Sequence, residues 1–212
     1  MKPKYVFYTL AAAWIIAIAG MIWAMDNKLN TPRHQVSSVV KVFVGKGHGS
    51  GVHIGNGYVV TAAHVIRDLP GASYLREDGV KGGLETLWVN ADYDIALLRL
   101  DYHEDVRSAY LSCRVPSIGE YLSLKGNPID LTHITTFGRV SGRMETIGRW
   151  KEAVPVDAAM AGGMSGGGAF DEHGYLIGIN VGAQLQPIGF GATFTGINLI
   201  VPGSTVCDLL AR

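Results

Sequence analysis

Residues 49–65 have the sequence GSGVHIGNGYVVTAAHV, and this stretch gives the clearest structural signal in the chain. Two runs of apolar and β-branched residues flank Gly55-Asn56-Gly57, a combination typical of a tight turn between antiparallel strands. Small residues follow the second run and lead to His64. The stretch therefore predicts a β-hairpin that ends at a histidine, and it indicates a β fold.

Similar short segments recur along the rest of the chain. Apolar residues make up 48% of the 212 residues, and the 28 glycines supply many turns around a sizeable core. Short helical turns are expected at residues 62–67 and 204–211. Many short strands with turn signals between them predict an all-β barrel or sandwich. Besides the hairpin, the expected strands are residues 36–44, 87–89, 95–100, 121–124, 135–140, 169–170, 175–181 and 192–195.

The charge balance and the few cysteines exclude some classes of function. Lys+Arg and Asp+Glu number 18 each, and no basic block stands out, so nucleic-acid binding is not expected. The seven histidines are scattered, so no metal site is expected, and no cofactor motif is present. Cys113 and Cys207 fit two interpretations, a disulfide or two small buried side chains.

The N-terminus begins with an apolar segment. Residues 5–25 contain no charge over 21 positions, which is long enough to cross a bilayer. We therefore expect a signal anchor at 1–26, a polar linker at 27–35 and one domain at 36–212. The protein would be a single-pass membrane protein with its domain on the exported, periplasmic or extracellular side. The alternative is signal-peptide cleavage after Ala17-Ile18-Ala19, which would make the domain secreted.

Three segments indicate nucleophilic chemistry. His64 follows a strand, Asp94 precedes the apolar strand 95–100, and Ser165 lies in a glycine-rich turn. A serine hydroxyl needs a base within hydrogen-bond reach, and histidine suits that role near neutral pH. A carboxylate on the other ring nitrogen fixes the histidine tautomer. The order His, Asp, Ser predicts a catalytic triad, with backbone N–H groups of Gly163 and Ser165 forming an oxyanion hole.

These segments resemble the signature blocks of trypsin-like serine proteases. The matching blocks are Thr61-Ala62-Ala63-His64, Asp94-Ile95-Ala96-Leu97 and Gly163-Met164-Ser165-Gly166-Gly167. Gly126-Asn127-Pro128 is similar to a segment of the bacterial HtrA-type branch. The resemblance covers residues 36–202. It implies two packed six-stranded antiparallel β-barrels with the site between them, and a serine endopeptidase that forms an acyl-enzyme.

The resemblance also suggests substrate contacts and partners. Ala159 lies where trypsin has its specificity aspartate, which favours an apolar P1 side chain in a polypeptide substrate. Val181, Gly182 and Ala183 are expected to pair with the substrate backbone. Family analogy implies a homo-oligomer, namely a trimer, and no PDZ module is expected after Ser165.

Two departures leave room for other interpretations. Met164 replaces the usual Asn or Asp and cannot pair with a newly cut N-terminus, so activity should need no such cut. Gly168 replaces the usual proline and adds backbone freedom. The main alternative is a catalytically inactive protease-like scaffold that binds partners at the membrane. An esterase of the α/β-hydrolase fold fits less well, because that fold requires the order Ser, Asp, His.

Overall fold

The computed structural model describes residues 37–66, 71–101 and 106–212, together with residues 14, 17, 18, 20 and 21. The chain divides into two units, Met1–Gln35 and Val36–Arg212. Apart from those five positions, the predicted anchor and linker lie outside the described residues. Among the residues that are described, no helix combines the length and hydropathy needed to cross a membrane.

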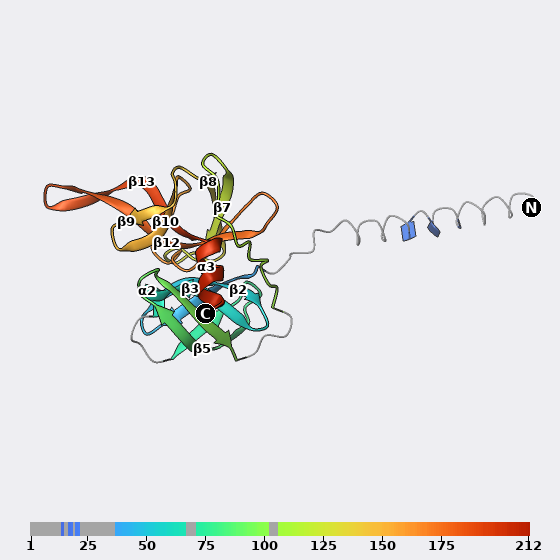
Figure 1. The fold of residues 1–212 in the computed structure, drawn as a ribbon. Coiled ribbons are helices and arrows are strands. Elements are labelled where there is room, and N and C mark those ends of the chain that lie inside the picture. Colours follow the sequence, from blue (N-terminus) through green and yellow to red (C-terminus); the bar gives the residue numbers. More distant parts are fainter. Residues whose placement is uncertain (1–13, 15–16, 19, 22–36, 67–70, 102–105) are drawn as a thin grey trace, which may run out of the picture. The chain divides into compact units, whose positions relative to one another are not determined.

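The first half of the larger unit is a closed six-stranded barrel with the order β1-β2-β3-β6-β5-β4. It forms the lower part of the domain in Figure 1. The predicted hairpin is confirmed, because β2 and β3 are joined through Asn56 and Gly57, whose φ angles are 53° and 78°. The elements are β1 (Val39–Val44), β2 (Gly47–Gly55), β3 (Tyr58–Ala62), α2 (Ala63–Ile66), β4 (Ala72–Leu75), β5 (Lys81–Asn90) and β6 (Ile95–Leu100).

The second half is a seven-stranded sheet with the order β8-β7-β11-β12-β13-β10-β9. The prediction of a second six-stranded barrel is therefore wrong. Between Val140, just after β8, and Val156 of β10 the described chain forms one isolated bridge, so the ladder does not close, and β9 adds a seventh strand beyond β10. The elements are β7 (Tyr121–Gly126), β8 (Ile134–Arg139), β9 (Glu145–Ile147), β10 (Trp150–Val156), β11 (Gly168–Phe170), β12 (Leu176–Ile188), β13 (Gly191–Pro202) and α3 (Gly203–Leu210).

Consecutive strand residues enter different hydrophobic cores. Val59 packs inside the barrel, whereas Val60 packs in a core shared by both halves. Leu176 packs in the shared core, and the next residue, Ile177, packs in the core of the second sheet. Side chains alternate across a strand, so this arrangement explains why the strands are apolar on both faces.

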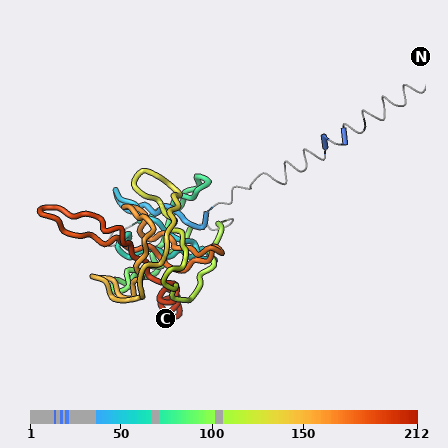
Figure 2. Tube along the Cα trace, turned by 90° about the horizontal axis from the view of Figure 1, so that it is seen from above, coloured from blue at the N-terminus to red at the C-terminus, as the bar shows by residue number. Residues whose placement is uncertain are grey.

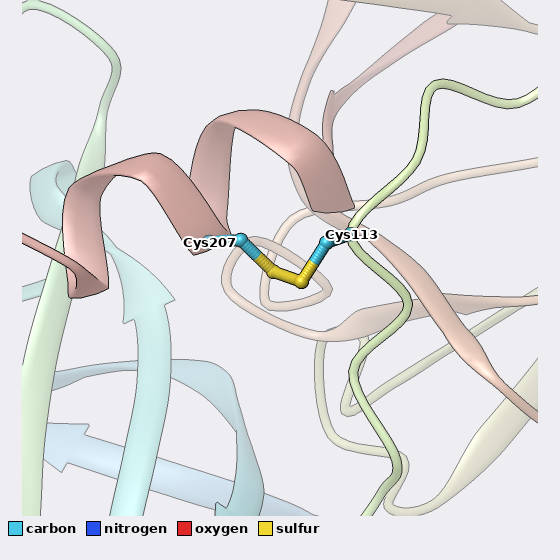
Figure 3. Close-up of a disulfide and its surroundings, with 2 residues drawn as sticks. All are labelled: Cys113 and Cys207. Carbon is cyan, nitrogen blue, oxygen red and sulfur yellow. A yellow bond between two sulfur atoms is a disulfide. The ribbon is translucent and has the colours of Figure 1, made fainter.

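The two cysteines are joined. Cys113, in the connection between β6 and β7, forms a disulfide with Cys207 of α3, as Figure 3 shows. Their Cα atoms are 5.6 Å apart, and 94 residues separate them in sequence. The disulfide interpretation is therefore correct, and the bond ties the last helix to the segment that connects the two halves.

The outer ends of β12 and β13 form a long hairpin that projects from the domain in both views (Figure 1, Figure 2). Neither strand contains a charged residue. Large apolar side chains on it are exposed, namely Leu185, Ile188, Phe190, Phe194 and Ile197. This hairpin extends well beyond the strands predicted at 175–181 and 192–195, and β4, β9 and β10 were not predicted at all.

Candidate active site

Strand pairing in the barrel brings His64 and Asp94 together. β3 pairs with β6 so that Ala62 lies opposite Ile95, which places the residues just beyond each strand side by side. The backbone N–H of Ala63 donates to the Asp94 carbonyl at 3.0 Å. The His64 backbone N–H donates to Asp94 Oδ1 at 2.9 Å, so the main chain fixes the pair as well as the side chains.

The imidazole of His64 has a defined orientation. Its Nδ1 lies 2.7 Å from Asp94 Oδ2. Because a carboxylate only accepts, Nδ1 donates, and Nε2 is left to act as an acceptor. Asp94 is 5% exposed, and its φ of 57° lies in the left-handed region that non-glycine residues rarely adopt. Such backbone strain is concentrated at functional sites.

Asp94 is kept charged despite its burial. Burial raises the pKa of this carboxyl, but hydrogen bonds from His64 and Trp150 and the attraction of His64 lower it. The net result is a pKa below the usual aspartate value. A buried carboxylate that stays ionised can stabilise a neighbouring imidazolium.

Sequence reasoning missed two further side chains beside this carboxylate. Trp150 Nε1 donates to Asp94 Oδ2 at 2.9 Å, and Arg149 Nη2 lies 3.9 Å from the same oxygen. Trp150 is the first residue of β10, 56 positions along the chain from Asp94, and Arg149 directly precedes that strand. No local motif signals the contact, because a tryptophan at the start of a strand usually contributes packing alone.

Ser165 lies on the loop before β11, and both sides of that loop are anchored. The Ser165 carbonyl accepts from the Ser50 N–H at 2.8 Å, and the Gly166 N–H donates to the Asn180 carbonyl at 2.7 Å. At Gly166, φ is 81°, and an added Cβ would collide with the Ser50 carbonyl oxygen. The glycine after the serine is therefore required by both backbone conformation and space.

The two N–H groups predicted for the oxyanion hole are oriented by their peptide units. The Gly162 carbonyl accepts from the Ile129 N–H, and the Met164 carbonyl accepts from the Gly167 N–H. In a trans peptide the N–H points opposite to the carbonyl, so the N–H groups of Gly163 and Ser165 point away from these anchors. Neither N–H has a hydrogen-bond acceptor among the residues that the structure describes.

His64 and Ser165 line one cavity of about 300 Å³. Three of the predicted substrate-contacting residues, Val181, Gly182 and Ala183, line it too. Ala159 is not among its lining residues, and its carbonyl accepts from Thr136 Oγ1 at 2.7 Å. The cavity is completed by Arg149, Trp150, Met160, Ala161, Gly162, Leu185 and Phe194.

The two unusual loop residues have structural roles. The Met164 side chain is buried in the core of the second sheet, so packing anchors this position rather than an ion pair. At Gly168, an added Cβ would lie 2.5 Å from Phe170 Cε2 and 2.7 Å from Leu176 Cδ1. Crowding therefore favours glycine here. In the described part of the chain, no cluster of three His, Cys, Asp or Glu side chains is suited to hold a metal ion.

Comparisons with known proteins agree with this arrangement. Residues 49–179 match the model of the trypsin-like peptidase domain. The chain is 33% identical over 162 residues to a probable periplasmic serine endoprotease of the DegP-like type from Brucella suis. It is 34% identical over 175 residues to the chloroplastic Protease Do-like 1 of Arabidopsis thaliana.

These matches cover 74% and 77% of this chain but only 31% and 38% of the two relatives, so the chain spans about a third of their length. A crystal structure of the serine endoprotease from Yersinia pestis superimposes with a TM-score of 0.72 at 26% identity, covering 84% of this chain and 63% of that one. The chain therefore belongs to the trypsin-like peptidase family, and it is similar to the DegP and HtrA type of serine endoprotease.

Proposed function

We propose that the protein is a serine endopeptidase in which Ser165 is the nucleophile, His64 the general base and Asp94 the residue that orients the histidine. The observation that carries the proposal is the cavity that His64 and Ser165 share, with His64 Nδ1 already held by Asp94. That contact leaves Nε2 available for the Ser165 hydroxyl proton.

The proposed reaction is acyl transfer. Ser165 Oγ attacks the peptide carbonyl carbon while its proton passes to His64 Nε2. The resulting oxyanion accepts hydrogen bonds from the N–H groups of Gly163 and Ser165. His64 then gives the proton to the leaving amine as the C–N bond breaks. Water, deprotonated by His64, hydrolyses the ester and restores the serine.

The second half would also bind the polypeptide. Residues 181–183 line the cavity, and β13 pairs with Gly182 and Ala183 on one side of β12. In the described sheet, β11 pairs with β12 only as far as Ile179, so the other side of residues 181–183 stays open. An extended peptide could add to that edge as a further strand.

We also propose that the domain acts outside the cytoplasm, tethered by residues 5–25. The uncharged run is long enough to span a bilayer. The disulfide fits an oxidising compartment, and the Brucella relative is described as periplasmic. Carbonate extraction of membranes from expressing cells tests the tether, since an anchored chain stays in the pellet. A chain released with its N-terminus at Gly20 would support the alternative of a cleaved signal peptide.

The catalytic proposal is tested with a fluorophosphonate probe, which labels activated serines. The full chain should be labelled, whereas Ser165→Ala and His64→Ala should not. Ser117→Ala removes an exposed serine away from the cavity and should behave like the parent.

Absence of labelling in a folded parent would overturn the proposal and leave the inactive scaffold as the better description. Equal labelling of Ser165→Ala and the parent would show that another serine is the nucleophile. Circular dichroism of each variant distinguishes loss of chemistry from loss of folding.

A further inference from the structure

Asp94 Oδ2 accepts two hydrogen bonds from different halves of the domain. His64 Nδ1 reaches it from α2 at 2.7 Å, and Trp150 Nε1 reaches it from β10 at 2.9 Å. The other oxygen, Oδ1, accepts the His64 backbone N–H. Three donors on two oxygens restrict rotation of the carboxylate about its Cβ–Cγ bond.

We propose that Trp150 is a positioning residue of the active site, whose indole N–H holds Asp94 Oδ2 in line with His64 Nδ1. The inference rests on the proposed function, because it concerns the same pair. Since Trp150 belongs to the second half, it also ties the acid of the barrel to the half that carries Ser165.

The local backbone of β10 sets the direction of the indole. The register between β9 and β10 shifts between Trp150 and Ala153, and Glu152 has a φ of 53°. A bulge of this kind re-aims the side chains beside it. Thr205 Oγ1 of α3 donates to Glu152 Oε2 at 2.7 Å, which holds the strained residue in place. The bulge is thus fixed by the rest of the fold.

Gly182 makes room for the indole. A Cβ at Gly182 would lie 2.5 Å from Trp150 Cζ2 and 2.7 Å from Cη2. The Arg149 guanidinium also lies 4.6 Å from the Trp150 ring centroid, a cation–π contact. The indole therefore has little space in which to leave Asp94.

The residues flanking Trp150 contact the same turn. Arg149 Nη2 approaches Asp94 Oδ2, and Lys151 Nζ donates to Asp92 Oδ2 at 2.8 Å. The ionisable groups around Asp94 are therefore His64, Arg149, and the pair of Asp92 with Lys151. The Trp150 indole is a neutral donor beside them. Removing its N–H takes away a hydrogen bond without changing the net charge.

The pH profile should report the loss of this donor. The indole N–H offsets part of the negative charge on Asp94. Without it, the carboxylate attracts the protonated imidazole more strongly. The acid limb of the rate profile, which reports the His64–Asp94 pair, should then move to higher pH. If Trp150 contributed packing alone, its substitution would lower the stability of the fold but leave the acid limb of the rate profile unchanged.

The test compares Trp150→Phe with Trp88→Phe in the full chain. Trp88 is a partly buried tryptophan of β5 that packs on the shared core, so its variant controls for loss of an indole. The measurement is the second-order rate constant for fluorophosphonate labelling between pH 5 and pH 9. For Trp150→Phe we expect a plateau about tenfold lower and an acid limb shifted up by about half a pH unit. Trp88→Phe should follow the parent.

A second readout separates this inference from the proposed function. The proton between His64 Nδ1 and Asp94 should give a low-field ¹H NMR signal, which can be measured without any activity. It should shift in Trp150→Phe and stay in Trp88→Phe. A parent that is not labelled but shows this selective shift would contradict the function and support the positioning role. An unchanged signal with an unchanged pH profile in folded Trp150→Phe would overturn the inference.

If Trp150→Phe does not fold, Gly182→Ala serves in its place. The added methyl displaces the indole but keeps the tryptophan. The same NMR shift is expected, and a signal identical to that of the parent would count against the inference.

Discussion

The barrel and the second sheet hold their functional residues in different ways. In the barrel, His64 and Asp94 are joined by backbone and side-chain hydrogen bonds across one strand pair. In the second sheet, Ser165 lies on a loop between strands, anchored by the carbonyls and N–H groups around it. In the proposed mechanism, the first half thus carries the base and the acid, and the second carries the nucleophile, most of the cavity walls and Trp150. The positions of His64 and Asp94 therefore depend on the register of a strand pair, whereas the position of Ser165 depends on a glycine-rich turn.

Breaking the pair in the barrel should have the largest effect. In Asp94→Asn, an amide N–H₂ can face His64 Nδ1 and favour the wrong tautomer. We expect the chain to fold and its turnover to fall by roughly 10⁴-fold. Labelling kinetics with the fluorophosphonate probe measure the change. A rate within tenfold of the parent would reject the role of Asp94.

Removing the disulfide between Cys113 and Cys207 should lower the stability of the fold. Cys113→Ser with Cys207→Ser opens a loop of 94 residues, and we expect the free energy of unfolding to fall by about 4 kcal/mol. Urea unfolding followed by circular dichroism measures it. The reduced parent should match the double variant. Equal stability of oxidised parent and variant would contradict the prediction.

Substituting one glycine of positive φ in the loop around Ser165 and one in the projecting hairpin compares how tightly the two segments are packed. Gly166→Ala should cost about 3 kcal/mol, because a Cβ meets the Ser50 carbonyl. Gly189→Ala at the hairpin tip, where φ is 55° and nothing lies within 4 Å, should cost only about 1 kcal/mol. Unfolding midpoints measure both. Similar losses at the two positions would mean that the loop around Ser165 is not tightly packed.

The low pKa of Asp94 makes a prediction for pH. Because the folded pKa is depressed, Asp94 stabilises the fold above its unfolded pKa, and this contribution is lost as pH falls through the folded pKa. The parent should therefore exceed Asp94→Asn in stability at pH 7, and the gap should narrow as pH falls through the depressed folded pKa of Asp94. Urea titrations at neutral and at acid pH measure the gap. A gap that is constant with pH would contradict the assignment.

The smallest effect concerns two phenylalanines on the hairpin. Phe194 lines the cavity, whereas Phe190 is exposed at the tip. Phe194→Ala should lower kcat/KM for apolar peptides about threefold to tenfold, and Phe190→Ala should leave it unchanged. Peptide cleavage assays measure both. Equal effects would show that the tip takes part in substrate binding.

Local patterns explain what could be predicted. The turn at Asn56 and Gly57, the strand 95–100 and the residues around His64 and Ser165 each have a signal within a few positions. Trp150 has none, because its contact depends on a bulge at Glu152 and on the space left by Gly182. β10 combines charged residues with Pro155, which hides its strand character. The strands predicted at 175–181 and 192–195 cover only parts of the β12–β13 hairpin. The remaining outer part includes Pro187 and exposed residues, so it gives a weak strand signal.

The core shared by the two halves has a consequence for how the protein could be divided. Val60 of the barrel and Ile179 of the sheet belong to one cluster, so each half separated from the other would expose apolar surface to water. Neither fragment should then persist as a monomer. A cut between β6 and Cys113 keeps both cysteines in the second piece, so the disulfide does not join the two pieces. The pieces should regain fluorophosphonate labelling only when they associate, and labelling would then report their association.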